Sequence, residues 1–422
     1  MVLQRIPRLR TAPGNPSPLR LIVPAIGVLL LAVILRLVLT GALARWEAAR
    51  MSDSALQKAA ASAHAPFAVV FELARRLERA GNFPAAAKAY QHAASIDPTA
   101  SEAWTGWGRA EFAAGNWAVA ERVLGKTVQL WPQHAEAHFV LAAILDGTFR
   151  RRAAREQLKI GLKWNGSRKE AWLSLGRLDM LLGDPRGAVE AFSVARRMDA
   201  GLTSLHGPYG AALLAAGRIP EARKELEAAL RADPSDLEAR LQLARALLTT
   251  PQGPDRVRGM QELTRVAEFA VNKAPAYIEA ARVWLAEGNR GDAGQALEHA
   301  VDANPYSIEA LTLLRDFYNQ SGRKAEADAI ARRLEPLAKL NRERDRLLDA
   351  IEKNQDLSQN LVRLGDVDTA MGDVTEAHGA FAAAVAMDPG NTRALDRLKR
   401  TAASAGAKAT HTAGTTHRGG KN

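Results

Sequence analysis

Two histidines have the spacing of a metal-binding pair on one helix face, because His134 and His138 are four residues apart. His134 follows Pro132 in what reads as a connection, and no third ligand has a suitable spacing. The chain has no cysteine, which excludes disulfides, cysteine-ligated iron–sulfur clusters and thiolate zinc sites. We therefore expect neither a metal site nor a cofactor.

Motifs typical of catalysis are also missing from the sequence. It contains no phosphate-binding loop, no G-x-G-x-x-G and no nucleophile elbow. Many acidic residues have basic neighbours at helical spacing, which is typical of solvated helix faces. We expect no catalytic residues, and predict that the protein is not an enzyme.

Arginine recurs at multiples of 34 residues, at Arg75, Arg109, Arg177 and Arg245. A row of guanidinium groups suits a peptide with acidic residues or a terminal carboxylate. The alternative is that these arginines form ordinary ion pairs with nearby acids, for which the candidates are Glu72, Glu78 and Asp179.

The formal charge of +11 is concentrated in the two ends of the chain. Residues 1–50 carry a net +6 and residues 400–422 a net +4, which leaves only +1 for residues 51–399. A nucleic-acid-binding domain concentrates its positive charge on the folded part. We therefore expect no nucleic-acid partner.

The N-terminal region contains one long apolar segment. Residues 21–44 carry Arg36 as their only charge, and as a helix they would be about 36 Å long, enough to cross a bilayer. Four arginines precede the segment, so the positive-inside rule places residues 1–20 in the cytoplasm and the rest outside. We predict a signal-anchor helix at residues 21–44, followed by a stalk at residues 45–66.

Two other interpretations of this segment remain open. Residues 42–44 read Ala-Leu-Ala and fit a signal-peptide cleavage site, although the apolar stretch is long for a signal peptide. The segment is also compatible with an ordinary apolar helix.

The central region repeats with a period of 34 residues. Several positions keep their character from one repeat to the next. Turn-type glycines stand at Gly81, Gly115, Gly183 and Gly217, with Phe149 as the only exception; alanine stands at Ala86, Ala120, Ala154, Ala188 and Ala222; large apolar residues stand at Tyr90, Leu124, Leu158, Phe192 and Leu226.

This pattern predicts stacked helical hairpins. Small residues let two helices approach closely, large residues fill the adjacent groove, and glycine permits a turn with positive φ between the helices. A single hairpin cannot bury its apolar face, so successive hairpins must stack into a solenoid.

The landmarks resemble those of the tetratricopeptide-repeat (TPR) family. Trp104-x2-Trp107-Gly108 and Trp172-x2-Leu175-Gly176 match the first helix of its repeat, and Ala188, Phe192 and Ala195 match the second. The resemblance implies an all-α fold, a right-handed superhelix of about nine hairpins over residues 67–400. The alternating charges of residues 341–346 favour a solvated helix face, and residues 401–422 read as a disordered tail.

The resemblance also implies a binding groove. In the family the position of the four arginines lines the concave surface, where neighbours three or four residues away share the face. These neighbours are Phe71, Thr105, Phe112, Leu173, Met180, Leu241 and Leu248. Phe71 and Arg75 stand where carboxylate-binding members of the family have lysine and asparagine. Trp117, Trp131 and Trp164 are further candidates for exposed binding residues.

These features predict a scaffold that binds other proteins or peptide segments, with an acidic peptide as one candidate. We expect it at a bacterial inner membrane, with its repeats in the periplasm. There it would help to assemble an envelope complex for polysaccharide export, pilus or secretion functions, or cofactor insertion. The alternative is a regulatory adaptor for a membrane enzyme or protease, and self-association through the last repeat also remains open.

Overall fold

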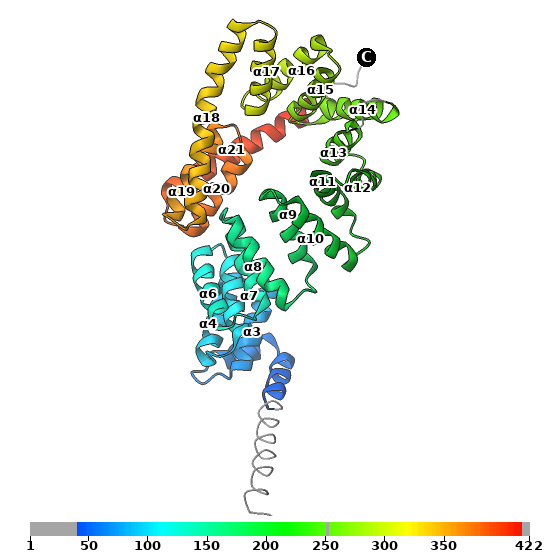
Figure 1. Ribbon diagram of the computed structural model, residues 1–422. Coiled ribbons are helices and arrows are strands. Elements are labelled where there is room, and N and C mark those ends of the chain that lie inside the picture. The colour runs from blue at the N-terminus through cyan, green and yellow to red at the C-terminus, as the bar shows by residue number, and fades with distance from the viewer. Residues whose placement is uncertain (1–39, 250–252, 416–422) are drawn as a thin grey trace, which may run out of the picture. The chain divides into compact units, whose positions relative to one another are not determined.

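The computed structural model describes residues 40–249 and 253–415, and these are helical almost throughout (Figure 1). The predicted transmembrane segment lies outside the described residues except for its last five, 40–44, and so does the basic segment before it. Among the described residues, no helix combines the length and the apolar character that a membrane crossing requires. The chain divides into two compact units, Met1–Ala110 and Glu111–Asn422.

Unit 1 contains the first helical hairpin and the helices that precede it. Residues 40–50 are helical, and the later helices are α2 (Asp53–Ala60), α3 (Phe67–Arg79), α4 (Phe83–Ile96) and most of α5 (Ser101–Ala113). Ala48 and Leu56 are buried in one cluster with Ala68 of α3. Arg76 of α3 donates hydrogen bonds to the Met51 and Ala49 carbonyls, both at 2.8 Å. The segment predicted as a stalk is therefore folded onto the first repeat.

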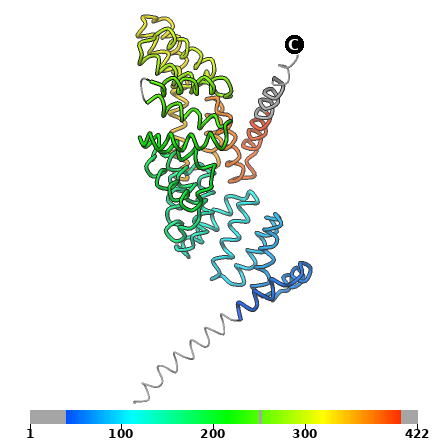
Figure 2. The backbone as a smooth tube through the Cα atoms, turned by 90° about the vertical axis from the view of Figure 1, so that its right-hand side faces the viewer, coloured from blue at the N-terminus to red at the C-terminus, as the bar shows by residue number. Residues whose placement is uncertain are grey.

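Unit 2 consists of successive antiparallel hairpins, stacked side by side as both backbone views show (Figures 1 and 2). Its helices are α6 (Trp117–Leu130), α7 (Ala135–Gly147), α8 (Arg151–Trp164), α9 (Lys169–Leu181), α10 (Pro185–Met198), the 3-10 turn η1 (Thr203–Leu205), α11 (His206–Ala215), α12 (Ile219–Ala232), α13 (Leu237–Leu248), α14 (Pro254–Phe269), α15 (Ala274–Ala286), α16 (Arg290–Ala303), α17 (Ile308–Gln320), α18 (Lys324–Glu352), α19 (Leu357–Ala370), α20 (Val374–Met387) and α21 (Thr392–Thr415).

The small and large positions of the repeat pack as the sequence predicts. A Cβ atom at Gly176 of α9 would collide with the Phe192 ring of α10, so only glycine permits this close approach of the two helices. The turn glycines have positive φ, for example +75° at Gly183 between the same helices. The predicted α-solenoid of hairpins is confirmed at this level.

Helix α18 is twice as long as the other second helices of the repeats, at 29 residues against 14 for α16 and α20. The second helix of its repeat continues without a break through the charged run at residues 341–346. Arg342, Asp345 and Arg346 are exposed as predicted, whereas Arg344 is partly buried and pairs with Asp368 of α19.

Phe149, the one non-glycine residue in the series of turn glycines, brings the α7–α8 turn into contact with the last repeat of unit 2. Phe149, in the turn between α7 and α8, has φ of +63°, and its side chain is buried in the core of the last repeat. It packs there with Leu347 and Ile351 of α18 and Leu361 of α19. Figure 1 shows the start of α8 beside the α19–α20 hairpin. A conformation that is unfavourable for phenylalanine is thus kept because the ring is buried.

Polar contacts surround the Phe149 ring. The first turn of α8 has no side-chain cap of its own, and the Glu352 carboxylate accepts hydrogen bonds from the backbone N–H groups of Arg152 (3.1 Å) and Ala153 (2.8 Å). Arg150 is buried, donates two hydrogen bonds of 2.6 Å to Glu121 and donates a third, of 3.2 Å, to Asn354. A carboxylate at a helix N-terminus is favoured by the unpaired N–H groups and the helix dipole. We call this set of interactions the closing contact.

The C-terminal helix continues into the segment predicted as a disordered tail, residues 401–422, because α21 extends to Thr415. Thr401 is buried, and its hydroxyl lies 3.0 Å from Nδ1 of His378 on α20. Residues 416–422 lie outside the described part of the chain.

Replacing Phe149 by glycine removes the closing contact of the ring while leaving a residue that favours the turn conformation. Glycine restores the usual turn residue and relieves about 1 kcal/mol of backbone strain, but the loss of ring burial costs about 1.5–3 kcal/mol. We expect faster amide hydrogen exchange in α19 and α20 of Phe149→Gly and no change in α10 to α12. Phe149→Leu, which keeps an apolar side chain, should stay close to the wild type. Unchanged exchange in α19 and α20 of Phe149→Gly would contradict the closing contact.

Candidate partner-binding surfaces

The arginine row is paired with acids and does not form an open cationic groove. Arg75 contacts Glu72 (3.2 Å) and Arg109 contacts Glu78 (2.5 Å), both within unit 1. In unit 2, Arg177 pairs with Asp146, and Arg245 contacts Glu279 at 2.9 Å. Asp179, considered from the sequence as a partner for these arginines, instead pairs with Arg155.

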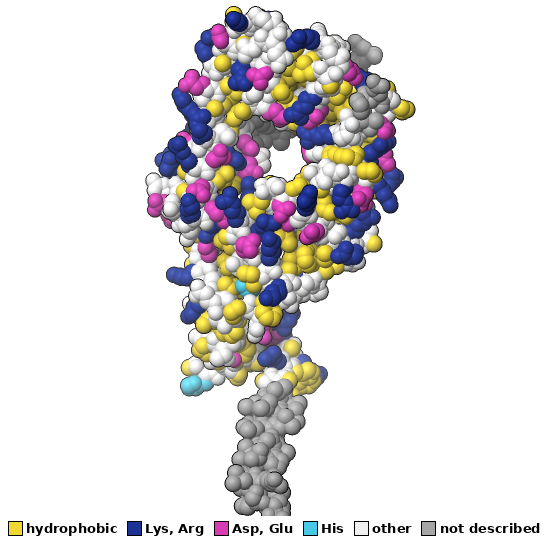
Figure 3. Space-filling view, viewed as in Figure 1, with side chains coloured by type: hydrophobic (Ala, Val, Ile, Leu, Met, Phe, Trp, Pro, Cys, Tyr) yellow, Lys and Arg dark blue, Asp and Glu magenta, His cyan; other side chains and the backbone are white. Residues whose placement is uncertain are grey.

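Most of these pairs join one repeat to the next. Cross-repeat pairs of the same kind occur throughout unit 2: Arg150–Glu121, Arg168–Glu136, Arg196–Glu225, Arg223–Asp255, Arg258–Glu227 and Arg256–Glu287. On the face drawn in Figure 3, basic and acidic side chains are interspersed over the repeats. The charges on this surface therefore hold neighbouring hairpins together, with a modest contribution from each exposed pair.

The apolar neighbours of the row are mostly used for packing. Thr105 and Leu241 are buried, so the structure does not place them on an accessible surface. Phe71 stacks on Phe67 with ring centroids 5.3 Å apart, and Phe112 lies 5.2 Å from Trp117. Leu173 and Met180 are partly buried against one core cluster.

The histidine pair has a structural role. His138 is buried, with Nδ1 2.7 Å from Oε1 of Gln157 and Nε2 2.9 Å from the Pro132 carbonyl. Across the described residues, no group of three or more metal-ligating side chains has a geometry that would hold an ion. Of the three tryptophans considered as binding residues, Trp164 is half exposed, with the Lys163 ammonium 5.7 Å from its ring centroid, while Trp117 and Trp131 are partly buried.

An apolar cleft between α14 and α15 is the surface best suited to a partner. Its volume is about 380 Å³, and it is lined by Met260, Leu263, Thr264, Ala267 and Glu268 of α14 and by Ala276, Tyr277, Ala280 and Trp284 of α15. Glu268 is the only charged residue of this lining and forms no ion pair with a described residue. The cleft was not predicted from the sequence, because it lies beyond Pro251, where the 34-residue register is interrupted.

Two segments of the chain match known repeats. Residues 105–146 and residues 208–246 each match a family model described as tetratricopeptide repeat, so the chain contains tetratricopeptide repeats as predicted. None of the curated proteins is similar enough to this chain to count as a match.

Several solved structures are similar to parts of the chain. The MamA protein is 24% identical over 39% of this chain and 90% of its own, with a TM-score of 0.36. YrrB, described as a TPR protein with an unusual peptide-binding site, is 21% identical over 45% of this chain and 96% of its own, with a TM-score of 0.36. PilF of Pseudomonas aeruginosa is 18% identical over 52% of this chain and 97% of its own, with a TM-score of 0.39. Scores this low support no conclusion about function.

The Arg109–Glu78 pair predicts a pH dependence of stability in unit 1. Burial acts to raise the pKa of the Glu78 carboxyl, but the Arg109 guanidinium and the Tyr90 hydroxyl, 2.7 Å away, hold that pKa below its ordinary value of 4.5. Glu78 therefore contributes stability that is fully present above pH 4.5 and is lost as the pH falls through the lower pKa of the folded state.

Glu78→Gln should destabilise α3 and α4 by about 1.5–3 kcal/mol at pH 7, measured by native-state hydrogen exchange, and by less at pH 3. Glu102→Gln, at an exposed position of α5, serves as the control and should have little effect at either pH. A difference between Glu78→Gln and the wild type that does not depend on pH would contradict this assignment.

Proposed function

We propose that this protein is a membrane-tethered scaffold that binds other proteins through its repeats and helps to assemble a cell-envelope complex. The apolar cleft between α14 and α15 carries the binding part of the proposal. Tyr277 and Trp284 offer aromatic surface of the kind that dominates protein interfaces, and the cleft is large enough to receive two or three apolar side chains.

The chemistry of the cleft indicates its partner. Apolar walls with a single unpaired carboxylate, Glu268, suit an apolar segment that is flanked by lysine or arginine. This differs from the acidic peptide expected from the arginine row, because the arginines of that row are already paired within the protein.

The location is proposed from the sequence. The apolar segment at residues 21–44 would anchor the chain in a bacterial inner membrane, with the repeats in the periplasm. Tethering raises the effective concentration of any partner that also resides at the membrane, which suits an assembly factor.

Blocking the cleft tests the binding proposal. Thr264 is exposed on α14 and lines the cleft, so Thr264→Arg fills it without disturbing the core. We expect recovery of co-purified partners with the full chain to fall at least about tenfold, the equivalent of one lost apolar side-chain contact. Gln261→Arg adds the same residue at an exposed position of the same helix outside the cleft lining, and should retain the partners. Equal recovery with both variants would contradict the role of the cleft.

A topology reporter tests the location. An enzyme that is active only outside the cytoplasm would be fused after Asn422, with and without residues 1–50. Activity that depends on residues 1–50 is the expected result. Inactivity of both fusions would place the repeats in the cytoplasm and overturn the envelope function. Recovery of a membrane protease among the partners would instead favour a regulatory adaptor.

A further inference from the structure

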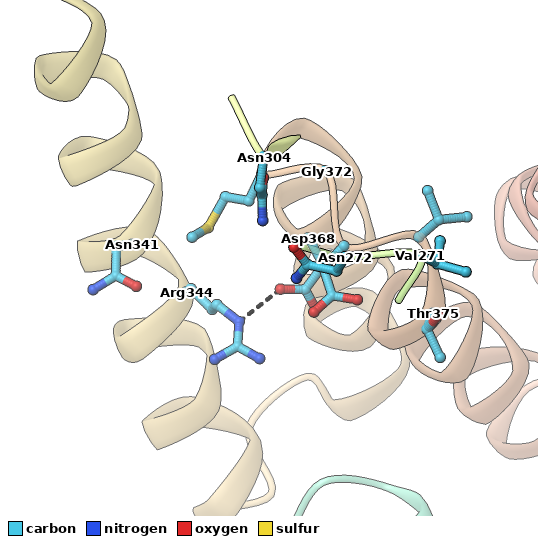
Figure 4. A pocket seen from close by; sticks show the side chains of 11 residues that line it. Val271, Asn272, Asn304, Asn341, Arg344, Asp368, Gly372 and Thr375 are labelled. Carbon is cyan, nitrogen blue, oxygen red and sulfur yellow. Dashed lines mark hydrogen bonds and ion pairs between the residues drawn. The ribbon is translucent and has the colours of Figure 1, made fainter. Parts of the chain in front are cut away.

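Two further cavities, one in each unit, differ in how their charged groups are paired. In unit 2, a cavity of about 750 Å³ has Arg344 in its wall, and Nε of this arginine donates a hydrogen bond of 2.6 Å to Oδ1 of Asp368 (Figure 4). Asp373 of the same lining caps α20 by accepting the Glu376 N–H at 3.0 Å. These charged groups already have partners within the protein, whereas those of the cavity in unit 1 do not.

The cavity of unit 1 lies between the helix at residues 40–50 and the start of the repeats, and its volume is about 390 Å³. The helix is fixed against α3, because Ala48 is buried there and Arg76 donates to two carbonyl groups at the end of the helix. The cavity is therefore preformed. Its lining consists of Gly41, Ala44 and Arg45 from the helix, Pro66, Phe67, Ala68 and Phe71 at the start of α3, and Asp97, Thr99, Ala100 and Glu102 around the start of α5.

Charged groups of both signs line this cavity. Arg45 and Glu102 are exposed, and neither forms an ion pair with a described residue. Asp97 is partly buried, and its Oδ1 accepts the N–H and the hydroxyl of Thr99 at 3.0 and 2.6 Å. The lining carries one cation and two anions, so it favours a ligand with a cationic group and disfavours a ligand that is only anionic. The Arg45 guanidinium in turn offers a fork of N–H donors to anionic oxygens.

Aromatic surface lies beside these charges. Phe67 and Phe71 are partly buried, and their stacked rings have centroids 5.3 Å apart. Together with Pro66 and Ala44 they form an apolar wall. The cavity therefore suits a ligand that carries an anion, a cation and an apolar chain.

The position of the cavity indicates where such a ligand comes from. A bilayer has a hydrocarbon core of about 30 Å and a total thickness of about 40–45 Å, so each headgroup layer is about 5–7 Å deep. If residues 21–44 span the core, residues 45–49 would cross this layer at about 1.5 Å per residue. The face of the helix opposite the cavity exposes Leu43 and Trp46, with the Arg50 guanidinium 4.4 Å from the Trp46 ring centroid. Tryptophan is enriched at this level of membrane proteins.

We propose that the cavity binds the headgroup of a zwitterionic phospholipid of the phosphatidylethanolamine class, taken from the membrane that anchors the chain. Arg45 donates to the phosphate, Glu102 accepts from the ammonium, and the acyl chains pass along Phe67 and Ala44 into the bilayer. This rests on the proposed membrane anchor, to which it adds a lipid preference and a fixed position of the first repeat at the bilayer surface.

The charges of the cavity select among the phospholipid headgroups. A primary ammonium donates hydrogen bonds to Glu102, whereas the quaternary ammonium of choline has no N–H group. The headgroups of phosphatidylglycerol and phosphatidylserine each carry a net negative charge, which the two carboxylates of the lining disfavour. Ethanolamine is the headgroup that satisfies both Arg45 and Glu102.

The test measures which lipid the purified full chain retains. The chain in detergent is incubated with equal amounts of dioleoyl-phosphatidylethanolamine and dioleoyl-phosphatidylglycerol, and the bound lipids are counted by native mass spectrometry. Arg45→Gln removes the donor to the phosphate, and Glu102→Gln removes the acceptor for the ammonium. Arg50→Gln and Glu47→Gln make the same changes of charge at exposed positions of the same helix outside the cavity lining, and serve as matched controls.

We expect the wild type and both controls to retain about fivefold more phosphatidylethanolamine than phosphatidylglycerol. Glu102→Gln should lose this preference, and Arg45→Gln should retain about fivefold less of the ethanolamine lipid.

Equal retention of the two lipids by the wild type, or the same lipid pattern in Arg45→Gln and Arg50→Gln, would overturn the proposal. So would an intact mass showing that the purified chain begins at Arg45, because cleavage after Ala44 would remove one wall of the cavity. If the topology reporter is active outside the cytoplasm while the lipid pattern does not respond to Arg45→Gln, the anchored scaffold remains and only the lipid site falls.

Discussion

The structure of unit 2 depends on the closing contact, in which one phenylalanine is inserted into a repeat about 200 residues further along the chain. A solenoid needs only contacts between neighbouring repeats, and such an array is held together by nearest-neighbour terms. Here Phe149 adds a stabilising contact between repeats that are not neighbours. The Glu352 carboxylate at the start of α8 and the Arg150–Asn354 hydrogen bond belong to the same contact. The positive φ of Phe149 costs about 1 kcal/mol, which its burial outweighs.

The surface of unit 2 is of two kinds. Between neighbouring repeats, arginines and carboxylates pair with one another, so those charges stabilise the stack and are not free for a ligand. Beside the α14–α15 loop, the Glu268 carboxylate forms no ion pair with a described residue, and an apolar cleft lies there. The loop itself contributes Val271 and Asn272 to a polar cavity of about 750 Å³. The cleft and this cavity both lie beyond the interruption of the 34-residue register.

The helical hairpins were predictable because their determinants are local. A glycine that must accept positive φ, and a small residue facing a ring one helix away, recur in register and can be recognised without a structure. Phe149 was visible as the one break in the glycine series, but its meaning was not, because its contacts come from α18 and α19. Asp146, the partner of Arg177, lies 31 residues away rather than three or four, so helical spacing could not identify it. The cavity lining comes from four separate segments, which no periodicity brings together.

A distance measurement across the closing contact tests this account most directly. The chain has no cysteine, so spin labels can be placed at single introduced cysteines without removing any native thiol. Arg152→Cys and Lys353→Cys lie at exposed positions on opposite sides of the contact, and electron–electron double resonance would measure the separation of their labels. A single narrow population at the short end of the measurable range is the predicted result. A broad distribution, or one centred at long distances, would mean that the last repeat does not dock on the α7–α8 turn, and would contradict the closed form of unit 2.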